Sequence, residues 1–143
     1  EAYHMTKELH LSQLHNPHSN VRNEHYCRRW ISIEAMRRLH QQGTTTPVAA
    51  AQISQYWQTT NQYLCLSIAK PAHGAGNDGV SVTVGLLLTP QVRERFRFLS
   101  DPDLKVEAVN TTCERCSIFD CEVRVRPPIV LQEADAKQDV LDA

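Results

Sequence analysis

The sequence has no long apolar run and no excess of charge of either sign, and each absence excludes a class of protein. The longest apolar stretch, Val84 to Leu88, is far shorter than the ~20 residues that span a bilayer, so we expect no membrane segment. Lysine and arginine number 15 against 16 acidic residues, which gives a net charge of −1. A DNA-binding domain usually carries a basic face, so this balance argues against one within the chain.

The N-terminus also lacks the basic and then apolar segments of a secretion signal, and the chain opens at Glu1. We therefore expect a cytoplasmic protein, cut from a larger one. Its 143 residues are enough for about one domain. Hydrophobic residues make up 41% and charged residues 22%, which excludes a disordered chain, a collagen and a coiled coil.

Hydrophobic periodicity predicts helices at both ends of the chain and strands between them. Residues 27–42 are expected to form a helix that ends at Gly43. The other predicted elements are helices at 3–15, 90–98 and 133–142, and strands at 49–57, 63–70, 80–88 and 105–109. This order indicates an α+β fold with a central, mostly antiparallel sheet and flanking helices. By analogy, the meander is compatible with sensory folds of the GAF or PAS kind.

Cysteines carry the strongest chemical signal. Their number is odd, which favours a metal site or reduced thiols over a disulfide framework. Cys113, Cys116 and Cys121 follow a C-x2-C-x4-C spacing, so all three sulfurs can reach one centre from neighbouring turns. Thiolates select zinc or iron–sulfur clusters. Cys27 is the best fourth ligand, whereas Cys65 lies inside an apolar strand and is expected to be a core residue.

Spacing alone favours an iron–sulfur cluster and zinc about equally. Zinc can take three thiolates and one imidazole, so His25, two residues before Cys27, is an alternative ligand. The simplest interpretation without metal is a set of reduced thiols or one bridge. A cysteine-rich C-terminal loop that binds metal therefore completes the predicted fold.

The segment Cys113-Glu-Arg-Cys116-x4-Cys121-x2-Arg124-x2-Pro127-Pro128, with Cys27-Arg-Arg-Trp30 upstream, resembles the C-terminal domain of the short-chain fatty acyl regulators. These are bacterial transcription factors of the xenobiotic-response-element helix-turn-helix type that control propionate and glyoxylate metabolism. The resemblance covers residues 26–130, within a single domain that also has an N-terminal helix and turn (1–25) and an acidic tail (131–143).

The resemblance implies a regulatory domain that holds a [4Fe-4S] cluster on Cys27, Cys113, Cys116 and Cys121. It also implies DNA binding through an upstream helix-turn-helix outside this chain, an acyl-coenzyme A effector, and a homodimer, because such regulators read two half-sites. Trp30 is a candidate to exclude solvent from the cluster, and Arg115 and Arg124 are candidates to offset the negative charge of the thiolates; the alternatives are core packing for Trp30 and ordinary surface charge for the two arginines.

No catalytic set is apparent, so we expect the chain not to be an enzyme. No Ser/His/Asp or Cys/His arrangement has a local motif, and no cysteine has an evident paired base. Residues 74–79 match GxGxxG, but a strand rather than a helix is predicted after them. A hairpin loop is therefore the better interpretation.

Overall fold

The structure is a computed structural model that describes residues 3–5, 24–43, 45–72 and 79–141. The chain divides into two compact units. One, here called the sheet unit, is Arg29–Val109, and the other, called the cysteine unit, is formed by Glu1–Arg28 with Asn110–Ala143. The prediction of a single domain stays a prediction.

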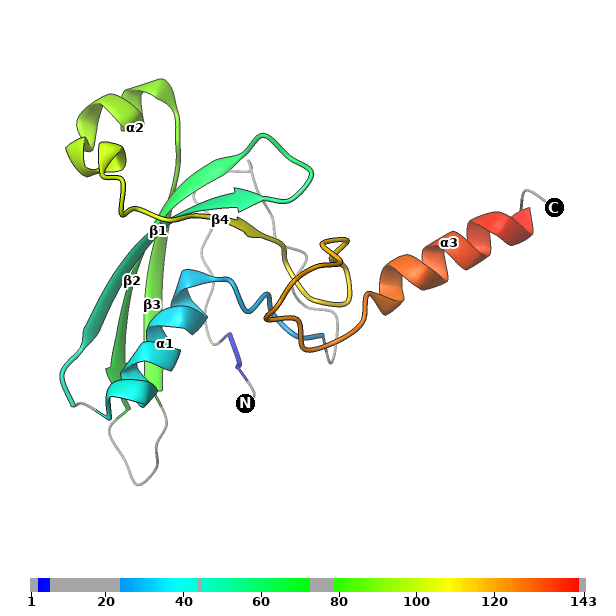
Figure 1. The fold of residues 1–143 in the computed structure, drawn as a ribbon, viewed down its shortest axis with the longest axis horizontal. Coiled ribbons are helices and arrows are strands. Elements are labelled where there is room, and N and C mark those ends of the chain that lie inside the picture. The colour runs from blue at the N-terminus through cyan, green and yellow to red at the C-terminus, as the bar shows by residue number, and fades with distance from the viewer. Residues whose placement is uncertain (1–2, 6–23, 44, 73–78, 142–143) are drawn as a thin grey trace. The chain divides into compact units, whose positions relative to one another are not determined.

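The sheet unit is built on four strands, β1 (Val48–Tyr56), β2 (Gln62–Pro71), β3 (Gly79–Leu87) and β4 (Val106–Val109), in the order β3-β2-β1-β4 (Figure 1). The pairs β1–β2 and β2–β3 are antiparallel, with Gln52 opposite Cys65 and Cys65 opposite Gly85. β4 runs parallel to β1. The α+β class is confirmed, and the sheet is mixed because its fourth strand is parallel.

Helix α1 (Ile31–Gln42) lies along one face of this sheet (Figure 1). Its apolar residues recur at every fourth position, and Ala35 and Leu39 pack against Ala69 of β2. Gly43 ends the helix in the left-handed conformation at φ 56°, where its N–H donates to His40 O. The predicted cap is confirmed, because this conformation favours a residue without a Cβ.

A helical connection leads from β3 to β4. Helix α2 (Pro90–Arg95) begins after Thr89, whose side chain accepts a hydrogen bond from Val92 N, and a 3-10 helix, η1 (Arg97–Ser100), follows it. Proline at the first helical position suits this start, because the missing N–H has no partner there in any case. The helix predicted at 90–98 is therefore confirmed but divides in two.

The cysteine unit has little regular structure apart from α3 (Ile129–Leu141). Residues 110–128, here called the cysteine loop, consist of turns and irregular backbone. The predicted tail helix exists and begins four residues earlier than expected. The helix predicted at 3–15 lies largely outside the described residues, and residues 3–5 have no regular structure. Within the described ranges, no helix has the length and apolar character that crossing a membrane requires.

Candidate metal centre

Two segments far apart in sequence pair side by side in the cysteine unit. Tyr26 and Thr112 form an antiparallel bridge. On either side of it, Cys27 N donates to Thr111 O at 3.0 Å and Cys113 N donates to His25 O at 2.9 Å. Successive residues of paired strands point to opposite faces. His25, Cys27 and Cys113 therefore leave the same face of this short ladder.

The thiols of the cysteine unit are mostly withdrawn from water. Cys27, Cys113 and Cys116 are 7%, 6% and 6% exposed, and Cys121 is half-buried. The described residues include all five cysteines, and no two of them form a disulfide. The four predicted ligands thus belong to one unit, and three of them are buried in reduced form.

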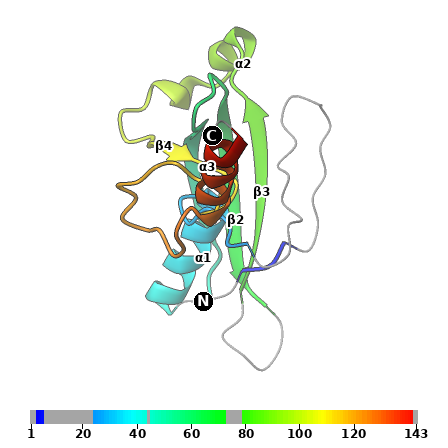
Figure 2. The same ribbon diagram turned by 90° about the vertical axis from the view of Figure 1, so that its right-hand side faces the viewer.

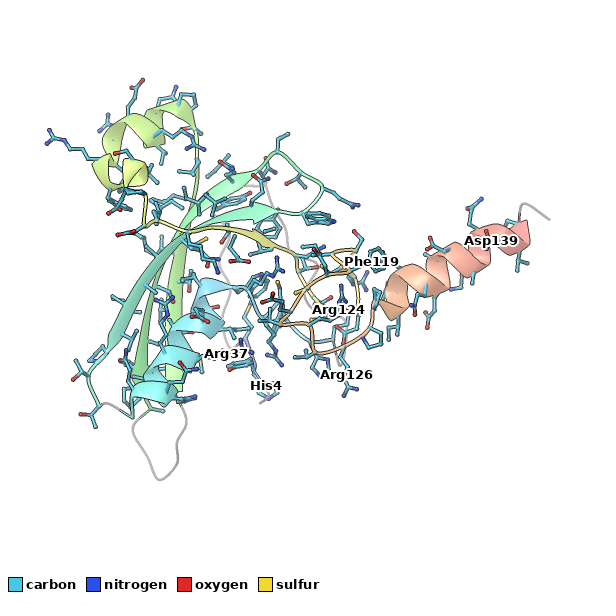
Figure 3. The ribbon with its side chains drawn as sticks, viewed as in Figure 1. His4, Arg37, Phe119, Arg124, Arg126 and Asp139 are labelled. Atoms are coloured by element: carbon cyan, nitrogen blue, oxygen red, sulfur yellow. The ribbon has the colours of Figure 1, made fainter. Side chains whose placement is uncertain are left out.

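Arg124 holds the cysteine loop from within. One terminal nitrogen, Nη1, donates to Cys113 O at 2.8 Å and to Arg126 O at 3.1 Å. The other, Nη2, donates to Cys116 O at 2.8 Å and to Ile118 O at 2.7 Å. Arg124 lies against the loop, whereas the exposed Arg126 and Phe119 project from it (Figure 3). One guanidinium therefore fixes the main chain at two of the predicted ligands, which suits its planar fork of donors.

The Tyr26–Thr112 bridge and the main-chain bonds beside it are here called the crossing. Two charged dipeptides reinforce the crossing by pairing across it. Arg115 Nη2 lies 2.9 Å from Glu24 Oε1, and Thr112 Oγ1 donates to Glu24 Oε2 at 2.5 Å. His25 donates from its main-chain N to Glu114 Oε2 at 2.9 Å, and its Nδ1 lies 2.7 Å from Glu114 Oε1. Sequence reasoning missed Glu24 and Glu114. The available signal was the same acid-then-base order of Glu24-His25 and Glu114-Arg115, which pairs each carboxylate with the other segment's base when the segments run antiparallel.

Glu114 is the most buried carboxylate among the described residues of the unit, at 3% exposure. Burial raises the pKa of its carboxyl, but the hydrogen bonds from His25 outweigh burial and leave this pKa below its usual range. The side chain is therefore ionised and accepts from His25 on both oxygens. Since Glu114 follows Cys113 directly, this contact also anchors the first cysteine of the motif.

Two of the sequence-derived candidates belong to the sheet unit. Cys65 lies on β2, half-buried, with its Sγ 3.7 Å from the point where a side chain on Gly85 would begin. Burial raises the pKa of the Cys65 thiol, against a hydrogen bond with Ser54 that lowers it. A protonated thiol suits packing rather than ligation. Trp30 precedes α1, and its role in excluding solvent from a cluster stays a prediction.

The arginines predicted to offset cluster charge have protein partners. Arg115 is paired with the carboxylate of Glu24, and Arg124 is bonded to main-chain carbonyls. Their described contacts are those of residues that position the loop. A charge-offsetting role stays a prediction.

The donor set fits a soft metal by chemistry, but the side chains do not form a closed site as they stand. Three buried thiols and a fourth half-buried one are what zinc or an iron–sulfur centre requires. Among the residues that the structure describes, however, no group of three or more His, Cys, Asp or Glu side chains is arranged to hold an ion. A cysteine turns about a single side-chain torsion, so closure would require rotation of the thiols on a backbone that Arg124 already holds.

Removing the buried carboxylate tests the crossing independently of any metal. Glu114→Ala in the metal-free protein is expected to lose about 1–3 kcal/mol of unfolding free energy, because two His25 donors lose their acceptor. Urea unfolding measures this change. Glu122→Ala removes an exposed carboxylate from the same loop and should change stability by less than about 0.5 kcal/mol. Equal effects of the two substitutions would contradict the anchoring role of Glu114.

No protein-family model matches the chain, and neither the curated proteins nor the solved structures that were compared with it include a match.

Proposed function

We propose that this chain is the sensory domain of a bacterial transcription factor of short-chain fatty acid metabolism, and that it holds a [4Fe-4S] cluster on Cys27, Cys113, Cys116 and Cys121. It is a regulator and not an enzyme, with a GAF- or PAS-like sheet and a metal-binding cysteine loop. Its partners are a second copy, an acyl-coenzyme A effector, and DNA contacted by an upstream helix-turn-helix outside this chain.

One observation carries the proposal. Four of the five cysteines, Cys27, Cys113, Cys116 and Cys121, belong to one compact unit, and Cys65 belongs to the other, which supports the proposed ligand set. Within that unit the Tyr26–Thr112 bridge sets Cys27 beside the segment that begins the motif. A distant single cysteine is thereby joined to a three-cysteine cluster, which is the distribution seen in several iron–sulfur sites.

The protein's own groups explain why such a centre would report a signal. When bound, a cluster supplies a centre whose charge and integrity depend on oxidation state and oxygen. The residues around it hold two chain segments together: Arg124 fixes the loop carbonyls, and the pairs Glu24–Arg115 and His25–Glu114 fix the crossing. Because binding free energy at such a site is also folding free energy, a change at the thiols changes the stability of the whole crossing.

A second candidate function is a structural zinc module for protein interaction or dimerisation, and His25 supports it. Its Nδ1 faces the Glu114 carboxylate at 2.7 Å, which leaves Nε2 as the nitrogen that can bind a metal. Histidine ligands of zinc commonly donate their other ring N–H to a carboxylate in this way. Three thiolates and His25 would then complete the tetrahedral set.

Metal analysis of anaerobically purified protein separates these functions. We expect a brown protein with about four irons and four sulfides per chain, and a colourless Cys116→Ser variant without them. One zinc per chain and no visible absorption would favour the structural module. If neither iron nor zinc is retained and all the thiols react freely in the folded protein, both functions are wrong.

A further inference from the structure

One face of the sheet, here called the outer face, is apolar over most of its length and ends at Gln55 and Gln62, which lie opposite each other. It consists of alternate residues from Ala49 to Ile53 in β1, Leu64 to Ile68 in β2 and Val80 to Leu86 in β3, with Val106 of β4. The strand register sets these residues directly across from one another, as in Ile68 opposite Val82. The only charged member is Lys70, at the margin opposite Val80.

The side of the sheet that α1 covers has the opposite character. Helix α1 packs there on small residues, and the buried Gln52, Ser54 and Ser67 lie on the same side of the strands. Gln52 Nε2 donates to Ser54 Oγ at 2.9 Å, so these polar groups are satisfied inside the unit. The helix therefore covers a face of small and polar residues and leaves the valine and isoleucine face.

Part of the outer face is exposed to a degree that is unusual for branched apolar side chains, whereas Ile53 and Leu64 on the same face are buried. Val82 is 66% exposed, Ile68 56%, Val84 55% and Val106 57%. No described element covers these side chains. An antiparallel sheet normally turns its apolar face to the core and its polar face to water. A contiguous patch of this kind marks an interaction surface.

No strand in the described part of the chain pairs with the edge of the sheet next to this patch. β3 is the terminal strand, beside β2 (Figure 2), and its nine residues, Gly79–Leu87, include no charged residue and no proline. Monomeric proteins usually block such an edge with lysine, proline or a bulge, because an open edge pairs with other chains. Face and edge together have the composition of a surface that is buried in an assembly.

We propose that the outer face is the surface on which two copies of this chain pack, sheet against sheet. A twofold contact needs a surface that is complementary to itself, and a valine and isoleucine face whose one charge, Lys70, lies at the margin meets that need with little like-charge repulsion. The exposed fractions correspond to roughly 500 Å² of apolar surface per copy, so a pair would bury on the order of 1,000 Å², the lower range for a specific interface. This inference does not depend on whether the cysteine unit binds metal.

Sedimentation velocity of the chain, from about 1 to about 100 µM, tests the proposal with a matched pair of variants. The wild type is expected to reach twice the mass of one chain. Val82→Lys places an ammonium in the contact, where its desolvation is costly, and should weaken self-association at least about tenfold. Val140→Lys makes the same change at a valine of α3 that is 77% exposed and should leave self-association unchanged.

Thermal unfolding of the same samples at low concentration completes the test. In the isolated copy Val82 is exposed, so Val82→Lys should unfold within a few degrees of the wild type. A wild type that stays monomeric at about 100 µM, or a Val82→Lys variant that associates as well as the wild type, would overturn the proposal. A monomeric wild type that Val82→Lys strongly destabilises would show instead that another part of the same chain covers the face.

Discussion

Serine in place of Cys27 is expected to abolish metal retention, whereas serine in place of Cys65 leaves it intact. Cys27 is buried beside the start of the motif in the cysteine unit, and Cys65 lies on β2 in the sheet unit. A hydroxyl is a poor substitute for a soft thiolate ligand. Loss of an outer partner of a metal site already costs 10- to 100-fold in affinity, so we expect loss of a ligand to cost more than about 100-fold.

The two variants are matched in chemistry and differ in place, which makes their comparison decisive. Iron, zinc and sulfide contents of anaerobically purified samples give the result. Cys65→Ser should unfold no more than about 1–2 kcal/mol more easily than the wild type, because only a half-buried sulfur is lost. Equal metal contents in the two variants would remove Cys27 from the ligand set and leave His25 as the nearest candidate for the fourth position.

The elements of the sheet unit could be predicted because each depends on local pattern. Ile31, Ala35 and Leu39 recur with helical spacing, and all three are buried in α1. The alternation through β2 and β3 gives strands within one or two residues of their bounds. The start of α1 was expected at residue 27, but the main chain of Cys27 is bonded to Thr111 instead. A contact across 84 residues of chain carries no local signal.

Two features of the fold could not be read from periodicity. The direction of β4 is set by the path of the chain through α2 and η1, so a four-residue strand gives no hint that it pairs in parallel with β1. Alternation shows that Leu64, Leu66 and Ile68 share a face, but not which face a helix will cover. Here α1 covers the other side, so exposure along this apolar face rises from the buried Leu64 to Ile68, which is 56% exposed.

In the candidate site, as in the fold, residue types and spacing can be read from the sequence, whereas long-range contacts cannot. Motif spacing selects Cys113, Cys116 and Cys121, and donor chemistry adds Cys27, so the sequence alone proposes these four side chains, and their binding of a metal stays a prediction. The contacts that hold the backbone of these cysteines in place could not be predicted from the sequence. Main-chain bonds such as Cys113 N to His25 O depend on no side chain, and the sequence gives no reason to expect that Arg124 would bind carbonyls rather than offset charge.

Arg124→Lys is expected to be nearly as damaging as the loss of a ligand, although it keeps the positive charge. Lysine presents one compact ammonium, which cannot span the carbonyls of Cys113, Cys116 and Ile118 as the two terminal nitrogens of arginine do. Each carbonyl left without a partner costs about 1–3 kcal/mol when buried. We therefore expect at least about 3 kcal/mol of destabilisation in the metal-free protein and about 10- to 100-fold weaker metal binding.

Cobalt titration and urea unfolding distinguish a positioning role from a charge role. Cobalt(II) gives visible sulfur-to-metal absorption on thiolates, so it reports affinity whether the native occupant is zinc or a cluster. Arg126→Lys is the matched control, because Arg126 is exposed and offers Arg124 only its main-chain carbonyl. If Arg124 acted through charge alone, lysine would preserve both stability and cobalt affinity. If Arg124→Lys loses both stability and cobalt affinity while Arg126→Lys changes neither, the Arg124 guanidinium fixes the backbone of the loop that carries the thiols.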